Sequence, residues 1–186
     1  NRGGETATLY FGGGTPSMLS DTHLGRLMET LDRLVPVDKL DEFSFEANPA
    51  TFTEKKVRFW RSLGMTRVSL GVQSLDSGIL HLLGREHTPA QALHSVEMLK
   101  NAGMAHINMD LMFAIPGQTL SIWEATLKEA VRAGTDHISA YNLTYEEDTE
   151  FFRSLLRGEK RQDPDEDASF FELAEHMLEA AGMRHY

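Results

Sequence analysis

Apolar residues follow two alternating patterns along this chain: short continuous runs, and longer segments in which they recur every three or four positions. The short runs predict buried strands, and the longer segments predict amphipathic helices. Since strands and helices alternate, we expect a parallel sheet built from β/α units and not a sheet of hairpins. The predicted strands are residues 7–11, 43–46, 68–72, 107–113 and 137–143.

Capping and helix-breaking residues set the limits of the predicted helices. Ser20 and Thr53 are expected to cap the first two helices, which Pro36 and Gly64 are expected to end. The later helices are predicted at residues 75–83, 89–102, 120–133, 149–156 and 168–181, with 183–186 as a candidate start of a sixth strand. Residues 1–186 are expected to form one α/β domain, in which 145–186 are the helical C-terminal part.

The charge and hydropathy of the chain indicate which classes of binding partner to expect. Its net charge is −10 and it has no cluster of Lys and Arg, which argues against nucleic acid because each phosphate contact needs a local cation. No apolar run approaches the roughly 18 residues of a membrane-spanning helix. We therefore expect no membrane span, a cytoplasmic location and a small-molecule partner.

Metal-ligating residues are not evident. The chain contains no cysteine, so it has neither disulfides nor thiolate ligands of its own. Its eight histidines include no pair at the spacing of a helical zinc site with a Glu between them. We predict no metal ligand among these residues.

Polar residues stand directly after nearly every predicted strand. Because the carboxyl ends of parallel strands lie on one face of a barrel, these residues are expected to converge on one small molecule. Any one of them taken alone would more often cap a helix or be solvated, so the ring as a whole carries the prediction. Its members are Thr15, Glu46, Gln73, Asp110, Asn142 and Thr144.

The glycine run at 12–14, followed by Thr15 and Pro16, is the sharpest local feature. Three glycines let the backbone approach a ligand where any Cβ would collide. The alternative is a tight strand-to-helix turn, and the Lys-Ser/Thr pair of a phosphate-binding P-loop is absent. By itself the loop predicts a polar ligand group and does not choose between phosphate and amino acid.

Six motifs in order give a close resemblance to a known family. They lie at residues 10–17, 45–49, 70–74, 84–87, 108–112 and 138–143, and they resemble the radical-SAM family of proteins like oxygen-independent coproporphyrinogen III oxidase. The resemblance implies a partial, six-unit (β/α)6 barrel of the TIM-like type that binds S-adenosylmethionine (SAM) beside a [4Fe–4S] cluster. In that family a three-cysteine loop after the first strand holds the cluster.

The cysteine loop and the first strand of the family are expected before Asn1. The sequence is therefore expected to be a fragment whose parallel sheet lacks its first strand. A missing strand exposes a sheet edge, which offers a route to dimerisation. Without cysteines the chain is expected to be inactive in radical chemistry, although much of the SAM pocket is retained.

The resemblance also implies a role for each candidate residue. Gly13, Gly14 and Thr15 would receive the amino and carboxylate groups of the methionyl part, with Glu46 beside the amino group. Arg85 would pair with the carboxylate, and Gln73 and Asp110 would accept the ribose hydroxyls. Thr144, with its neighbours Tyr141 and Asn142, would line the adenosine or substrate side.

Two functions follow from the resemblance, and a third does not depend on it. The first is a radical-SAM module related to coproporphyrinogen oxidation, in which two propionates become vinyl groups. The second is a haem chaperone, which binds and delivers haem without oxidising a porphyrin; the segment from Tyr141 to Glu147 is more similar to this branch. The third is an ordinary β/α-barrel enzyme without radical chemistry.

Overall fold

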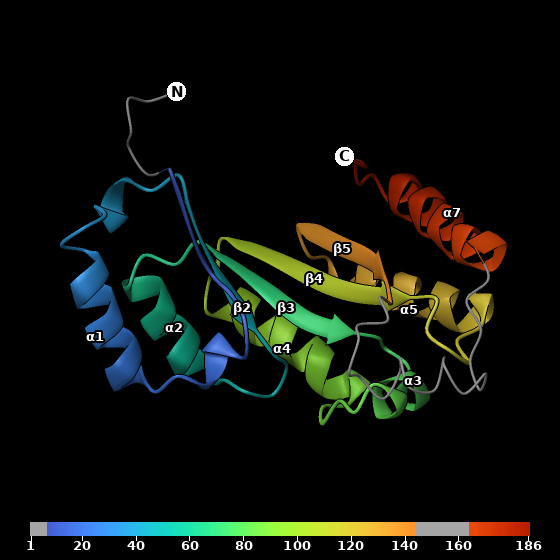
Figure 1. The fold of residues 1–186 in the computed structure, drawn as a ribbon, viewed down its shortest axis with the longest axis horizontal. Helices are drawn as coiled ribbons and strands as arrows, with labels where there is room; N and C mark the ends of the chain where they lie inside the picture. The colour runs from blue at the N-terminus through green and yellow to red at the C-terminus, as the bar shows by residue number, and fades with distance from the viewer. Residues whose placement is uncertain (1–6, 144–163) are drawn as a thin grey trace.

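Five parallel strands form the sheet of this protein in a computed structural model, which describes residues 7–143 and 164–186. Each strand pairs with the next along the chain, so the order in space is the order in sequence (Figure 1). The strands are β1 (Thr8–Phe11), β2 (Glu42–Ala47), β3 (Arg67–Gln73), β4 (His106–Phe113) and β5 (His137–Asn142). The predicted α/β class and parallel sheet are confirmed.

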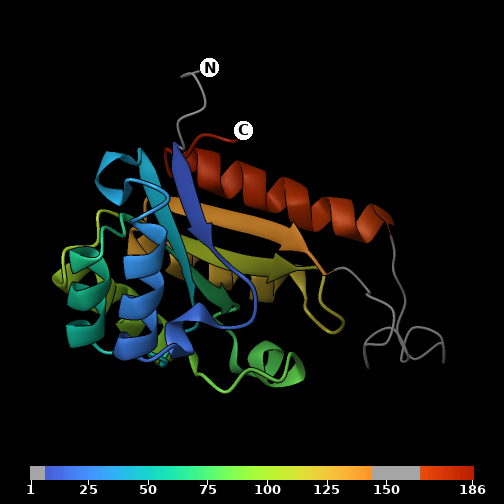
Figure 2. The ribbon, with the colours of Figure 1, turned by 60° about the vertical axis from the view of Figure 1, so that its left-hand side comes forward.

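Helices connect the strands and pack as a layer against one face of the sheet (Figure 2). Ser20 and Thr53 cap the first two through hydrogen bonds to backbone N–H groups, as predicted. The helices are α1 (Asp21–Leu31), α2 (Glu54–Ser62), α3 (Ser77–Leu82), α4 (Pro89–Asn101), α5 (Leu120–Ala133) and α7 (Pro164–Ala180), with 3₁₀ helices η1 (Pro16–Met18) and η2 (Val37–Lys39). The short helix α3 lies beyond the carboxyl end of β3 (Figure 1).

The core lies between the sheet and this helical layer. Strand residues alternate between the two faces of the sheet, and those that face the helices are apolar and buried. In β2 and β3 they are Phe43, Phe45, Val68, Leu70 and Val72, and all join one cluster with side chains of α1, α2, α4, α5 and α7. The opposite, concave face is therefore left for polar residues, which is where the site forms.

Three predicted boundaries differ from the structure. Helix α1 ends at Leu31 rather than near Pro36, because the chain turns at residues 32–34 and leaves Leu34 77% exposed. Helix α7 begins at Pro164, four residues earlier than predicted, since proline suits the first turn of a helix. Residues 183–186 form no strand, and the predicted helix at 149–156 lies outside the described residues.

Candidate functional site

A pocket of about 210 Å³ opens at the carboxyl end of the strands, on the concave face of the sheet. It combines one cation, two carboxylates, two amide side chains and a glycine loop. It is lined by Gly14, Thr15, Pro16, Glu46, Ala47, Asn48, Ser69, Gly71, Gln73, Arg85, Asp110 and Tyr141. Six of the eight predicted site residues thus line one pocket; Gly13 lies beside it, and Thr144 lies outside the described residues.

The glycine loop is tied to Glu46. The backbone N–H of Gly13 donates to Glu46 Oε2 at 2.9 Å, and the Tyr10 hydroxyl donates to the other carboxylate oxygen. Both Gly13 and Gly14 have positive φ, of 83° and 54°, which a residue with a Cβ rarely adopts. The loop is therefore shaped by its glycines, and it fixes the orientation of the Glu46 carboxylate.

Tyr10 is a contact that the sequence prediction missed. Desolvation of its hydroxyl and the hydrogen bond to Glu46 raise the pKa of Tyr10 above the ordinary value of a phenol. The hydroxyl therefore keeps its proton and remains a donor to the carboxylate at neutral pH. Tyr10 lies two residues after Thr8 in β1, so the two side chains point to the same face of the sheet. The alternation of faces along that strand would have placed Tyr10 on the concave face.

A buried hydrogen-bond network holds Asp110. Its carboxylate accepts from Ser69 Oγ at 2.8 Å and from Asn108 Nδ2 at 2.7 Å. Asn108 also donates to Ser139 Oγ at 3.0 Å and accepts from His137 Nδ1 at 2.6 Å. Asp110 is thereby fixed from three neighbouring strands, and its orientation does not depend on a ligand.

Burial dominates the titration of Asp110. Desolvation raises the pKa of this carboxyl, the hydrogen bonds from Ser69 and Asn108 act in the opposite direction, and the negative charge of Glu46 adds to the rise. Two carboxylates that share a pocket therefore carry an electrostatic cost. A ligand that brings positive charge or hydroxyl donors would offset it.

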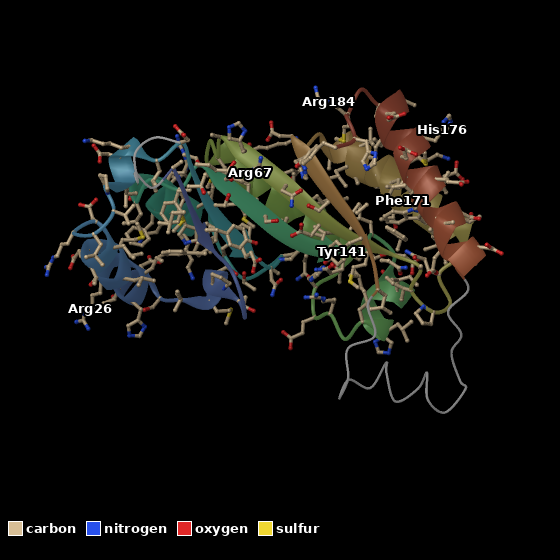
Figure 3. The ribbon with its side chains drawn as sticks, turned by 45° about the horizontal axis from the view of Figure 1, so that its top comes forward. Arg26, Arg67, Tyr141, Phe171, His176 and Arg184 are labelled. Carbon is tan, nitrogen blue, oxygen red and sulfur yellow. The ribbon has the colours of Figure 1, made fainter. Side chains whose placement is uncertain are left out.

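Gln73 and Tyr141 meet across the pocket. The Tyr141 hydroxyl donates to Gln73 Oε1 at 2.5 Å, although β4 separates their two strands. Figure 3 shows Tyr141 near the carboxyl end of β5, whereas Arg67 lies toward the opposite end of the sheet. Gln73 is buried, so the free Nε2 end of its amide is available only to groups within the pocket.

Arg85 supplies the positive charge of the pocket. It comes from the loop between α3 and α4, where Gly84 has a φ of 66°. Its guanidinium is half-buried, and it forms no ion pair with any residue in the described ranges 7–143 and 164–186. A carboxylate group of a ligand would match this fork of donors.

One predicted contact is wrong. Asn142 was expected beside Thr144 in the pocket, but its side chain donates to Asp167 Oδ2 of α7 at 2.8 Å. Adjacent residues of a strand point to opposite faces, so Tyr141 reaches the pocket while Asn142 faces the helices. The motif was therefore interpreted correctly for one residue and on the wrong face for the next.

A larger cavity, of about 950 Å³, runs along β5 and is lined by α7 and residues 181–186. It shares only Tyr141 with the polar pocket. Within the described part of the chain β5 pairs with β4 alone, so this cavity borders an open sheet edge. The smaller pocket brings the charged groups together, and we take it as the candidate site.

Two classes of feature are absent from the described residues. No group of three or more His, Asp or Glu side chains there is arranged to hold a metal ion. None of the helices in the same ranges is both long and apolar enough to cross a membrane.

Known proteins share both the sequence and the fold. The heme chaperone HemW of Lactococcus lactis subsp. lactis is 35% identical over 96% of this chain, and that of Bacillus subtilis is 34% identical over 96%. Coproporphyrinogen III oxidase (HemN) from Escherichia coli has the same fold over 96% of the chain, with a TM-score of 0.81 and 23% sequence identity. The chain spans about half the length of the curated relatives it matches, 48% of each HemW protein.

A family model covers the first five of the six motifs. The model of the radical SAM superfamily matches residues 1–130, which include the glycine loop, Glu46, Gln73, Arg85 and Asp110. The matched residues therefore contain most of the pocket as well as four of the five strands. This chain belongs to the radical SAM superfamily.

Proposed function

We propose that the polar pocket binds SAM, and that the protein acts in haem metabolism as a haem-handling protein of the HemW kind. The observation that carries the proposal is the convergence of Glu46, Arg85 and Asp110 on one small pocket from three separate parts of the chain. The alternative is a porphyrin-oxidising protein related to coproporphyrinogen III oxidase.

The chemical groups of the pocket suit the methionyl end of SAM. An ammonium group beside Glu46 would meet a carboxylate held by Tyr10 and Gly13. A carboxylate group would meet Arg85, whose guanidinium offers paired donors. Gly14 and Thr15 border the same end of the pocket, so a zwitterion finds opposite charges at fixed positions.

The other end of the pocket suits a ribose. Asp110 accepts hydrogen bonds, and the Gln73 amide both donates and accepts, so together they complement two neighbouring hydroxyls. Gly71 lies beneath them: a Cβ there would come within 2.9 Å of Asn48 Oδ1 and 3.2 Å of Gln73 Nε2. The absence of a Cβ at Gly71 lets the Asn48 and Gln73 side chains approach the backbone of β3 at the pocket.

The [4Fe–4S] cluster does not fit this chain. Such clusters are held by cysteine thiolates, and the sequence contains no cysteine. SAM supplies radical chemistry in the superfamily, but nothing in the chain's own residues provides the electron for it. What these residues would do is bind the ligand, orient it and exclude water from it.

Haem handling is favoured over porphyrin oxidation by the relatives. The proteins of L. lactis, B. subtilis and E. coli that match over 96–100% of this chain are all named heme chaperone HemW, at 33–35% identity. The likeness to HemN, at 23% identity, is a likeness of fold. Because the chain covers about half of each relative, haem binding by the whole protein is a proposal.

Titration calorimetry with SAM tests the pocket. We expect weak binding that Arg85→Ala and Asp110→Ala each reduce by about 10-fold or more, since a charged hydrogen bond contributes about 1.5–3 kcal/mol. Arg58→Ala, on the exposed outer face of α2, is the matched control and should leave the affinity unchanged. Absence of heat with the unmodified protein would remove the site assignment.

The choice between the two functions needs a second assay. Haem titrated into the protein should change its visible absorbance saturably, and coproporphyrinogen should bind more weakly than haem. Tighter binding of coproporphyrinogen than of haem would instead favour the oxidase alternative.

A further inference from the structure

His87 lies outside the pocket but touches the strand end that forms it. The ring is 7% exposed, and its Nε2–H donates to the backbone carbonyl of Val72 at 3.1 Å. Val72 is the residue before Gln73, and His87 is two residues after Arg85. One imidazole therefore joins the loop that carries Arg85 to the strand end that carries Gln73.

The strand end at Gln73 is strained. Gln73 has a φ of 68°, and the Ser74 N–H donates to the Val72 carbonyl at 2.9 Å, which together define a γ-turn with positive φ. A long side chain rarely adopts this conformation, and it persists only where the surroundings hold it. The pairing register of β3 with β4 also shifts between Leu70 and Gln73.

The Gln73 side chain borders the pocket at this turn. Gln73 still pairs with Leu111 of β4 beyond the register shift, and its amide accepts the Tyr141 hydroxyl. The carbonyl of Val72 receives two donors, the Ser74 amide from within the turn and the His87 ring from outside it. A carbonyl oxygen has two lone pairs, so both bonds can form at once.

Several hydrogen bonds also hold the chain between Gln73 and Arg85. The Ser74 hydroxyl accepts from the Asp76 amide, and Asp76 caps α3. After α3, the Arg85 N–H donates to the Leu80 carbonyl at 2.9 Å, and Thr88 opens α4 with a capping box. His87 closes this loop of about 15 residues with a further hydrogen bond, which ties the Arg85 loop directly to the strand end at Gln73.

We propose that His87 is a positioning residue, which holds the Gln73 turn and the Arg85 loop together in the geometry that a SAM-like ligand requires. This inference rests on the proposed function of the pocket. His87 does not touch the ligand itself, since it is not among the residues that line the pocket. It acts through the Val72 carbonyl on one side and through the backbone of residues 85–87 on the other.

The electrostatics agree with this role. Burial lowers the pKa of His87 and the positive charge of Arg85 lowers it further, while the hydrogen bond to Val72 acts in the opposite direction. A neutral ring adds no second positive charge beside Arg85. It keeps the proton on Nε2, where the Val72 carbonyl accepts it.

Two polar substitutions of His87 distinguish the effect of losing its hydrogen bond from the effect of losing the imidazole ring. In His87→Gln the amide N–H reaches approximately the position of Nε2, whereas in His87→Asn it reaches only that of Nδ1. We expect His87→Asn to weaken SAM binding about 10-fold in titration calorimetry and His87→Gln to recover most of that loss. His94→Asn, on the exposed face of α4, is the matched control and should bind as the unmodified protein does.

A double-mutant cycle with Gln73→Ala tests whether the effect passes through the turn. If it does, adding His87→Asn to Gln73→Ala reduces the affinity by less than His87→Asn does alone. Equal binding by His87→Asn, His87→Gln and the unmodified protein would overturn the inference while leaving the pocket intact. No SAM binding by the unmodified protein would overturn the proposed function, and the inference with it.

Discussion

The charge of Asp110 is unfavourable for the stability of the folded protein. Its carboxylate lies among Ser69, Asn108 and the negative charge of Glu46, and burial raises its pKa. The charged form is therefore less favourable in the folded protein than in the unfolded chain. Ionisable groups whose charge costs stability are characteristic of functional sites, where a ligand supplies the missing partner.

Replacing Asp110 by Asn should separate stability from binding. The amide removes the buried charge and still accepts from Asn108, so we expect a higher melting temperature at pH 7, by about 2–4 °C for each kcal/mol gained. SAM affinity should fall, because a ribose hydroxyl loses its charged acceptor. Differential scanning calorimetry and titration calorimetry on the same samples measure both effects, with Glu97→Gln on the outer face of α4 as control. A variant that is less stable would show that the carboxylate is needed by its neighbours.

The elements of the sheet were predictable to within one or two residues, because apolar residues gather in short runs between loops and helices. The expected burial holds for β2, β3 and β4 but not for the edge strands β1 and β5, which are only partly covered. Helix α5 was predicted at both ends, since Gly134 terminates it in the left-handed conformation. The end of α1 was not, because the apolar residue Leu34 continues the helical spacing although it packs on nothing. The spacing of apolar residues does not by itself show whether another part of the chain packs against them.

Residues near the carboxyl ends of the strands were proposed for the site, whereas Ser69 and Asn108, further back in β3 and β4, were not. Ser69 and Asn108 are polar positions inside otherwise largely apolar runs, and they face the concave side with Gly71 and Asp110. Asn142 was placed on the wrong face because a shift of one residue reverses the direction of a side chain. The γ-turn at Gln73 is contacted by His87, which is 14 residues further along the chain, so the residues around Gln73 do not by themselves indicate it.

Strand β3 offers a test of the pocket that leaves every polar group in place. In Gly71→Ala the new Cβ would approach Asn48 Oδ1 and Gln73 Nε2, both of them ends of side chains that can move by a few tenths of an ångström. We expect SAM affinity to fall several-fold while the free energy of unfolding, measured in urea, changes by less than about 1 kcal/mol. Gly25→Ala in α1, where the nearest atom is 3.9 Å away, is the control. It should add about 0.5–1 kcal/mol of stability and leave binding unchanged.

At the scale of the whole molecule, two histidines couple folding to pH. Burial lowers the pKa of His87 and of His137 below the ordinary value of 6.5. Between that value and the lower folded pKa the unfolded chain binds more protons than the folded one. The stability that these residues contribute is therefore complete above pH 6.5 and is lost as the pH falls through the folded pKa values.

The melting temperature should accordingly decline as the pH is lowered from 7.5 to 5. Each histidine lowers the free energy of unfolding by at most about 1.4 kcal/mol per pH unit. His87→Gln removes one titrating group and keeps the donor to Val72, so it should flatten the decline. His94→Gln removes an exposed histidine and should not. A pH profile that His87→Gln leaves unchanged would contradict the assignment of a neutral, buried ring.

The outer edge of β1 is where we expect two copies of the molecule to associate. Within the described residues β1 pairs with β2 alone, and β5, at the other edge, is flanked by α7 and residues 181–186. An unpaired edge offers a row of N–H and C=O groups to a second copy. We expect sedimentation velocity of the 186-residue chain to show dimers that increase with concentration.

Thr8→Lys places a charge on this edge and should shift the equilibrium toward monomer, whereas Thr30→Lys, on the exposed face of α1, should not. Equal behaviour of the two variants would place the contact elsewhere, and a monomer at every concentration would mean that the edge is not used.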